Sequence, residues 1–296
     1  MLKRGGVGNE IDKTAVIADN VILGNYNYIG KNVVISGFKG ALDTRIIIGD
    51  CNYIHDNTRI LIGEDGLVVG DWNVFHNSML VMGQKEMSIG HNCWFGQNTI
   101  LDSTAGLFIG SGVRVGLYSQ IWTHVASGEL IEGCSLFKEE PTIIEDEVWL
   151  VGSCNVGLGI RIGKRAICMN GSLITKNVRA NSVVRGSPAK EVEGLSFYKE
   201  ISIKEKLSMM NGWILEFVAL NNKNDYSIEK NNSSVAISNN YGERLIFSME
   251  EYSESMIDDK VTFFDLKLKK YTKKLTALER SFYRFIYDHK ARFLPF

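Results

Sequence analysis

The chain has 296 residues, a formal net charge of −1, 29 glycines and only three prolines. A chain of this length can bury a substantial core, as one large or two ordinary domains. The balanced charge gives no global electrostatic field that would favour binding to nucleic acid or to an anionic membrane. No apolar stretch approaches the roughly 20 residues that span a bilayer, and the first residues lack the apolar segment of a signal peptide. The five cysteines show neither a disulfide framework nor CxxC spacing, so we expect a reduced, cytoplasmic protein.

Apolar residues recur every six positions through most of residues 10–195. The step is clearest from Ile144 to Ile174, where each bulky residue is followed four places later by a mostly small one. Neither a helical stripe nor strand alternation gives this spacing, and fixed self-similarity is typical of a solenoid. A right-handed β-helix or a sandwich does not keep an uninterrupted six-residue step. The pattern therefore predicts an all-β solenoid for residues 1–195, a left-handed parallel β-helix of hexapeptide repeats.

Longer repeats predict the size of one coil. Pairs of hexapeptides such as "IGDCNY-IHDNTR" and "IGHNCW-FGQNTI" recur at shifts of 20 or 21 residues. Two strict hexapeptides and a longer third side make one triangular coil, whose bulky residues point inward. Gly and Asn near the corners tolerate positive φ, and parallel strands pair from coil to coil at ~4.8 Å.

The repeat is interrupted between Ile121 and Ile144. The inserted segment, residues 122–143, contains "WTHVASGELIEGCSLFKEEPT" and is the longest break in the solenoid. A loop on a rigid scaffold is where function tends to lie, which makes His124 the leading catalytic candidate. Cys134 is the rival nucleophile, but no base lies beside it in the sequence.

Residues 196–296 have a different pattern. The segment "IKEKLSMMNGWILEFVAL" predicts an amphipathic helix, short strand candidates follow, and a second helix opens with a capping box from Thr276 to Glu279. We expect a small C-terminal mixed α/β domain appended to the solenoid. Its basic and aromatic final segment fits either an acceptor-binding surface for an anionic glycan or a charged helix face that caps the solenoid.

Several of these features together resemble a known family. The hexapeptides, the histidine-bearing loop, "PTIIEDEVWLVG" and "NGSLITKNVRANSVVRGSPAK" are similar to the left-handed β-helix acyltransferases. The nearest subgroup comprises the galactoside, maltose and xenobiotic acetyltransferases and the O-acetyltransferases of bacterial surface polysaccharides. Over residues 10–195, the resemblance implies direct transfer from acetyl-CoA to a saccharide hydroxyl, on a capsule or lipopolysaccharide glycan or a sugar precursor, in a homotrimer.

The resemblance implies a role for His124. Family members carry their catalytic histidine in this loop, and a neutral imidazole can remove the proton of a sugar hydroxyl as it attacks the thioester. Either Asp102 or Glu129 could orient the imidazole. Asn98 and Asp102, in "FGQNTILDST", resemble the family's acceptor-binding segment, although both residue types also serve ordinary turn chemistry.

The donor side is also implied by resemblance. Trp149 is similar to a tryptophan that shields the thioester end of the pantetheine arm, and Asn170 departs from the small residue usual at its position. The expected acetyl-CoA contacts are Trp149, Gly152, Asn170, Thr175, Lys176, Arg185, Pro188 and Lys190.

Two other functions remain open. One is N-acyl transfer to an amino sugar nucleotide. The other is a non-catalytic or metal-binding β-helix, suggested by His55 and His76, which share a slot one coil apart. Two histidines fall short of the three or four ligands typical of zinc, so we expect no metal.

Overall fold

The computed structural model describes residues 5–38, 44–251 and 258–296. These residues form two compact units, Met1–Tyr198 and Lys199–Phe296, here called unit 1 and unit 2. In the described part of the chain, neither helix is long and apolar enough to cross a membrane.

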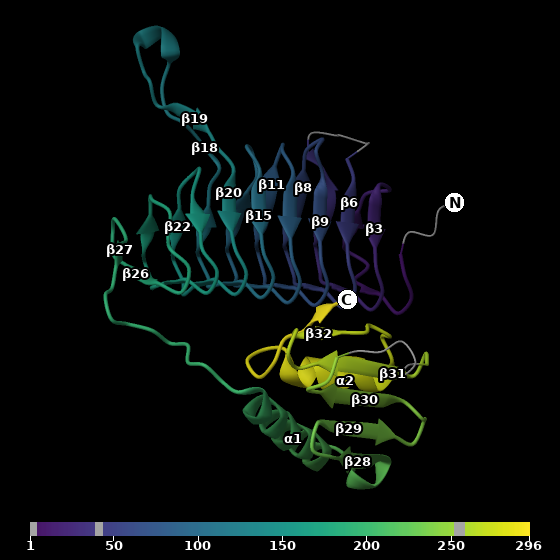
Figure 1. The fold of residues 1–296 in the computed structure, drawn as a ribbon. Helices are drawn as coiled ribbons and strands as arrows, with labels where there is room; N and C mark the ends of the chain where they lie inside the picture. Colours follow the sequence, from purple (N-terminus) through teal and green to yellow (C-terminus); the bar gives the residue numbers. More distant parts are fainter. Residues whose placement is uncertain (1–4, 39–43, 252–257) are drawn as a thin grey trace. The chain divides into compact units, whose positions relative to one another are not determined.

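Most strands of unit 1 are short and lie in three sheets, here called A, B and C (Figure 1). In hydrogen-bonded order, sheet A contains β1 (Glu10–Ile11), β4 (Tyr28–Ile29), β7 (Tyr53–Ile54), β10 (Val74–Phe75), β13 (Trp94–Phe95), β16 (Arg114–Val115), β21 (Trp149–Leu150), β24 (Ile167–Cys168), β26 (Val183–Arg185) and β27 (Lys190–Glu191). Sheet B contains β2 (Val16–Ile17), β5 (Val34–Gly37), β8 (Arg59–Ile62), β11 (Leu80–Gly83), β14 (Ile100–Asp102), β17 (Gln120–Ile121), β22 (Asn155–Val156) and β25 (Leu173–Ile174). Sheet C contains β3 (Val21–Leu23), β6 (Ile46–Ile48), β9 (Leu67–Val69), β12 (Met87–Ile89), β15 (Leu107–Ile109), β20 (Thr142–Ile144) and β23 (Arg161–Ile162).

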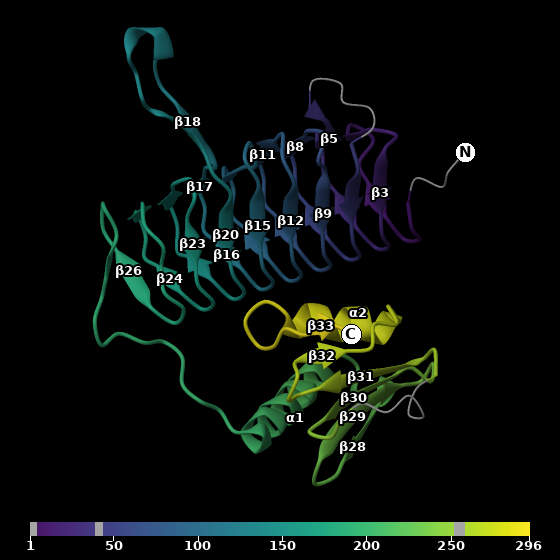
Figure 2. The ribbon, with the colours of Figure 1, turned by 45° about the horizontal axis from the view of Figure 1, so that its top comes forward.

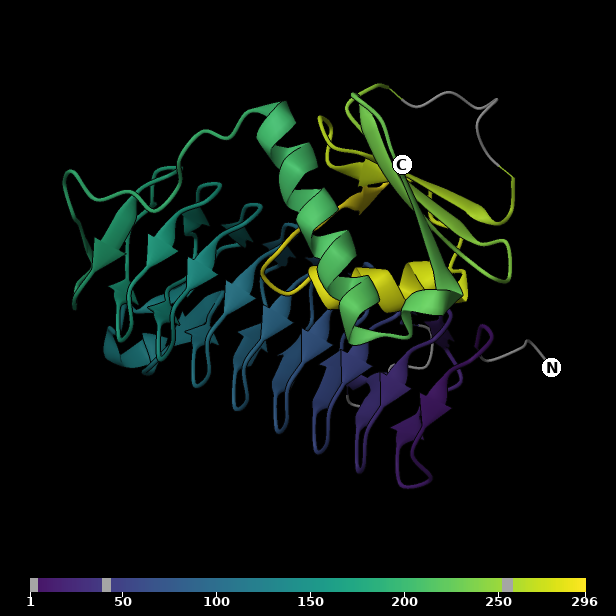
Figure 3. The same cartoon turned by 90° about the horizontal axis from the view of Figure 1, so that it is seen from below.

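The chain visits the three sheets in turn, so each circuit lies one step along the stack (Figure 3). Among the described strands, the pairings within the three sheets are parallel except for the closing β26–β27 hairpin. The expected mostly parallel β-structure with two helices is confirmed, and the topology is consistent with a parallel β-helix.

The bulky residues of the hexapeptides form the core. Phe75 and Phe95 occupy equivalent positions one coil apart, are at most 1% exposed, and have ring centroids 5.0 Å apart. Ile54 and Val115 extend the same buried column through the β7–β10 and β13–β16 pairings. The six-residue apolar step thus becomes a continuous column of side chains inside the stack.

Buried asparagines tie successive coils together. Asn27, Asn52 and Asn73 each precede a strand of sheet A and are at most 1% exposed. The Oδ1 of Asn27 accepts from the backbone N–H of Asn52 at 2.8 Å, and Asn52 does the same for Asn73 at 2.8 Å. Asn73 in turn accepts from the N–H of Cys93 at 2.7 Å. We call these three residues the asparagine ladder.

The interruption forms an antiparallel hairpin arm. Strands β18 (His124–Ala126) and β19 (Phe137–Glu139) pair, with His124 opposite Glu139, and the arm ends in a 3₁₀ turn, η2 (Leu130–Glu132). Figures 1 and 2 show the arm projecting away from the stacked coils. Its apolar side chains Leu130, Ile131, Leu136 and Phe137 are 55–89% exposed.

Unit 2 is a six-stranded mixed sheet with two helices. Its elements are α1 (Ile203–Leu220), η3 (Lys223–Asp225), β28 (Tyr226–Lys230), β29 (Ser234–Asn239), β30 (Arg244–Ser248), β31 (Val261–Asp265), β32 (Lys270–Tyr271), α2 (Ala277–Ile286) and β33 (Leu294–Pro295). Both predicted helices are present, and the Thr276 hydroxyl accepts from the N–H of Glu279 at 3.2 Å, which is one half of the predicted capping box. The Glu279 carboxylate does not make the return bond to Thr276 and accepts instead from the Thr262 hydroxyl and from the N–H groups of Lys274 and Leu275. The helices meet through Phe217 and Phe282, whose ring centroids lie 5.1 Å apart.

Candidate active site

The structure places His124 against Asp102 at the base of the arm. Asp102 ends β14, and His124 begins β18. Trp122 and Thr123 connect β18 to β17, the strand that pairs with β14. The Nδ1 of His124 lies 3.0 Å from the Oδ2 of Asp102. The histidine side chain is 33% exposed and the aspartate side chain is 0% exposed.

The surroundings of Asp102 keep its carboxylate ionised. Burial by itself raises the pKa of Asp102, but hydrogen bonds from Thr104, His124 and Thr123 outweigh burial and hold the pKa below the usual aspartate value. An ionised carboxylate only accepts hydrogen bonds, so the proton between the two side chains sits on Nδ1 of His124. The Nε2 lone pair is then available to take a proton from another molecule.

An indole ring lies beside the imidazole. Trp122 meets His124 edge-on, with ring centroids 6.0 Å apart. The Trp122 Nε1–H donates to Oε1 of Gln120 at 3.2 Å, which fixes the ring against β17. The orientation of the imidazole is therefore set by the contact of Nδ1 with Asp102 and by the ring contact with Trp122.

The sequence left open which carboxylate orients His124, and the contact is to Asp102. Glu129 is exposed near the tip of the arm, where it precedes η2. The buried position of Asp102 favours an orienting role over direct contact with an acceptor. Cys134 is also on the arm, and its Sγ lies 3.8 Å from the Ser127 hydroxyl.

Asn98 occupies an exposed corner between β13 and β14. Its φ is 58° and its N–H donates to the carbonyl of Asn77 at 3.2 Å, so its backbone serves the turn. Gly152 and Asn170 lie along the same edge of the stack, since a Cβ built on Gly152 would lie 2.9 Å from the Oδ1 of Asn170. The acceptor role of Asn98 stays a prediction.

The expected donor residues gather near the end of the stack. Arg185 and Lys190 face each other in the β26–β27 hairpin, which also contains Pro188. The N–H of Ala189 donates to the carbonyl of Leu173 at 2.8 Å, which joins this hairpin to β25. Thr175 and Lys176 follow β25 directly and are exposed, and Trp149 in β21 is 45% exposed.

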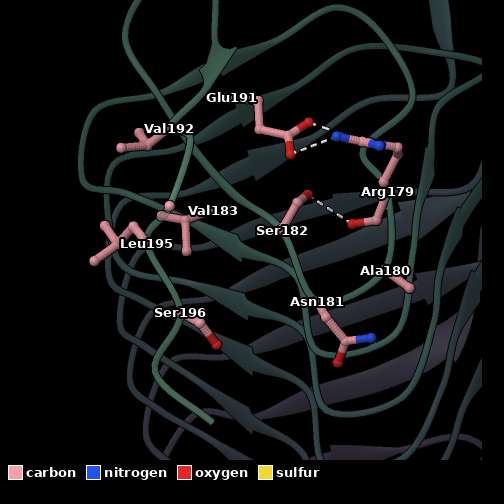
Figure 4. Close-up of a pocket in the computed structure, with 10 residues that line it drawn as sticks. Arg179, Ala180, Asn181, Ser182, Val183, Glu191, Val192, Leu195 and Ser196 are labelled. Atoms are coloured by element: carbon pink, nitrogen blue, oxygen red, sulfur yellow. Dashed lines mark hydrogen bonds and ion pairs between the residues drawn. The ribbon is translucent and has the colours of Figure 1, made fainter.

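A pocket of about 420 Å³ lies at the same end of unit 1 (Figure 4). Arg179 forms a two-pronged ion pair with Glu191 across it, at 2.7 and 3.2 Å. The lining residues, Arg179–Val183, Glu191–Val192 and Gly194–Ser196, include neither His124 nor any expected donor contact. Sequence reasoning did not single out this pocket.

The histidine pair on sheet A forms a ring stack. His55 and His76 stack with centroids 5.1 Å apart at 9°, and Trp94 meets His76 edge-on at 4.8 Å. Burial lowers the pKa of both histidines. The neighbouring Asp56 partly opposes this effect by raising the pKa of His55, whereas His55 further lowers the pKa of His76. Among the described residues, no group of three or more histidines, cysteines or carboxylates is arranged to hold a metal ion.

Comparison with known proteins connects the chain with acetyltransferases of the hexapeptide-repeat type, as the sequence resemblance suggested. No family model matches the chain. Over 74 residues it is 36% identical to a 2,3,4,5-tetrahydropyridine-2,6-dicarboxylate N-acetyltransferase of Staphylococcus aureus. That match covers 25% of this chain and 31% of the relative, so the chain aligns with less than a third of the relative's length.

Three solved structures are similar to parts of the chain. A maltose O-acetyltransferase from Clostridium difficile is 25% identical, with 38% of this chain and 60% of that one covered and a TM-score of 0.34. The hexapeptide-repeat acetyltransferase VCA0836 from Vibrio cholerae is 19% identical, with 56% and 74% covered and a TM-score of 0.32. The polysialic acid O-acetyltransferase OatWY is 18% identical, with 67% and 92% covered and a TM-score of 0.37.

Proposed function

We propose that this protein is an acetyl-CoA-dependent O-acetyltransferase that acetylates a saccharide hydroxyl, with His124 as general base. The observation that carries the proposal is the His124–Asp102 pair at the base of the arm. The pair combines a partly exposed imidazole with a buried, ionised carboxylate, which is the arrangement a general base requires. The names of similar proteins, among them a maltose and a polysialic acid O-acetyltransferase, support a saccharide acceptor.

The chemistry follows from the tautomer. Nε2 of His124 takes the proton of the acceptor hydroxyl while its oxygen attacks the thioester carbonyl of acetyl-CoA. The positive charge that develops on the imidazole is stabilised by Asp102 at Nδ1. When the tetrahedral intermediate collapses, the C–S bond breaks and the proton passes from Nε2 to the departing thiolate, giving free CoA and the acetyl ester.

Acetyl-CoA, the donor, would bind near the end of the stack that contains the β26–β27 hairpin. Lys176, Arg185 and Lys190 are exposed cations from adjoining segments and suit the phosphates of CoA. Trp149, Gly152, Asn170, Thr175 and Pro188 would line the pantetheine arm and the adenine.

The assembly belongs to the same proposal. We assign the stack a left-handed sense and the active protein a cytoplasmic homotrimer, in which the exposed apolar side chains of one arm, such as Ile131 and Phe137, contact a second copy. Static light scattering of the full chain tests this state, and a monomer at working concentration would contradict it.

The decisive experiment incubates the full chain with acetyl-CoA and a panel of oligosaccharides, following thiol release and acetylated product by mass spectrometry. We expect His124→Ala to lower the rate about 10²- to 10⁴-fold, the usual contribution of a general base. His289→Ala, at an exposed histidine in unit 2, is the matched control and should keep wild-type activity. Equal rates in His124→Ala and wild type would refute the assignment.

N-acetylation is the second candidate, because the curated relative is an N-acetyltransferase. The same base would then remove a proton from an amine, such as that of an amino sugar nucleotide. Amino sugars in the same panel separate the two candidates, since an amide product resists the mild alkali that cleaves an acetyl ester.

A further inference from the structure

The carboxylate of Asp102 is enclosed by hydrogen-bond donors from two neighbouring coils. We infer that Thr104 and Thr123 are positioning residues, which together hold this carboxylate in the one orientation that presents Oδ2 to His124. The inference rests on the proposed function and concerns how the general base is oriented. Sequence reasoning singled out neither threonine.

Thr104 fixes the carboxylate from within its own coil. Its hydroxyl donates to the Oδ1 of Asp102 at 2.7 Å, and its backbone N–H approaches the same oxygen at 3.3 Å. Oδ1 is therefore directed toward the turn that follows β14. The other oxygen is left pointing toward the next coil, where His124 lies.

Thr123 fixes the carboxylate from the next coil. Its hydroxyl donates to Oδ2 at 2.7 Å and its N–H donates to the same atom at 3.0 Å. The same hydroxyl accepts from the N–H of Ala105 at 3.0 Å, and the carbonyl of Thr123 accepts from the N–H of Glu140 at 3.0 Å. This fully buried residue thus joins the turn after β14, the start of the arm and its return.

The two threonines also keep the carboxylate charged. Hydrogen bonds to an ionised carboxylate stabilise the charged form, which opposes the effect of full burial. Removing one hydroxyl should let the carboxylate rotate away from Nδ1 and take up a proton at higher pH. The threonines therefore control both the direction and the ionisation of the group that orients the base.

The experiment compares Thr123→Val and Thr104→Val with Thr123→Ser in the full chain. We expect each valine variant to lower kcat about 10- to 100-fold, as the loss of one hydrogen bond to an ionised group predicts, with KM for acetyl-CoA unchanged. The acid limb of the kcat/KM profile should move to lower pH, because a carboxylate turned away from Nδ1 stabilises the protonated imidazole less. Serine keeps the hydroxyl and should restore both.

The matched control is Thr58→Val. Thr58 is also fully buried, donates its hydroxyl to the carbonyl of His76 at 2.9 Å and accepts from the N–H of Met79, but it lies in an earlier coil. It should lose stability comparable to Thr123→Val in thermal unfolding while kcat and the pH profile stay as in wild type. A Thr58→Val variant with the same kinetic defect would overturn the inference, because the effect would then be structural.

A spectroscopic readout separates this inference from the proposed function. An Nδ1–H donated to a carboxylate gives a low-field proton resonance, which Asp102→Asn should abolish and the valine variants should shift. An unshifted resonance in both valine variants would refute the positioning role even if His124→Ala is inactive. If no acceptor in the panel is acetylated, the proposed function fails while the resonance still tests the geometry.

Discussion

Asp102 in unit 1 and Glu279 in unit 2 are both 0% exposed, and their surroundings move the two pKa values in opposite directions. Asp102 in unit 1 accepts from five donors, and its pKa lies below the usual value. Glu279 in unit 2 accepts from the Thr262 hydroxyl and from the N–H groups of Lys274 and Leu275, all at its Oε2. Its Oε1 is buried without a described partner, and burial raises its pKa. The hydrogen-bond donors around Asp102 outweigh the effect of burial on its pKa, whereas those around Glu279 do not.

The largest effect is expected from a substitution of Asp102. In Asp102→Asn, the new side chain would present an amide to Nδ1 of His124 and favour the wrong imidazole tautomer. We expect kcat to fall about 100-fold or more, measured by thiol release from acetyl-CoA, because the base is no longer oriented or stabilised as it gains charge. Glu129→Gln, at the other candidate carboxylate, should have little effect. A larger loss in Glu129→Gln would reverse the assignment.

How much the sequence predicts differs between these sites for a physical reason. The six-residue step and the break between Ile121 and Ile144 predicted the stacked strands and the segment that contains His124, because each coil contacts only its neighbours. A shift of 20 or 21 residues already places Asp102 beside the start of the arm. Glu129 is nearer to His124 in sequence, but the arm carries it outward, and hairpin pairing is not visible in the hexapeptide pattern.

Unit 2 was less predictable because its contacts are non-local. The Thr276 N-cap, part of the predicted capping box, located the start of α2, since that signal lies within four residues. Nothing local indicates that β30 and β31 pair in parallel, or that Thr262 reaches the carboxylate of Glu279. Likewise, the sequence alone gives the hydroxyls of Thr104 and Thr123 no role beyond ordinary turns, because their shared partner becomes visible only when neighbouring coils are stacked.

The asparagine ladder tests how much hydrogen bonding of buried backbone N–H groups adds to the stability of unit 1. Asn52→Leu removes the acceptor for the buried N–H of Asn73, and we expect a loss of about 1–3 kcal/mol in the free energy of unfolding. Urea unfolding followed by circular dichroism measures it. Asn77→Leu, at an exposed turn position, should change stability far less. Equal losses would mean that side-chain acceptors between coils add nothing beyond strand pairing.

The smallest expected effect concerns the pH dependence of unit 2. A carboxyl group whose pKa is raised in the folded state adds stability below its unfolded pKa, and this contribution is lost as pH rises through the folded value. Glu279→Gln removes that titration, so unit 2 should lose less stability from acid to neutral pH than it does in wild type. Hydrogen exchange of the α2 amides in the full chain, corrected for intrinsic rates, reports this slope.

Glu205 supplies the matched control, because it holds the same third helical position in α1 as Glu279 does in α2 but is exposed and closes a capping box with Ser202. The hydroxyl and N–H of Ser202 hold the pKa of Glu205 below its usual value, so its contribution is present above the unfolded pKa and is lost as pH falls. Glu205→Gln should therefore change the slope in the opposite sense to Glu279→Gln. If both variants change the slope of stability against pH in the same direction relative to wild type, burial does not control the pKa of Glu279. The contrast with Asp102 would then need another cause.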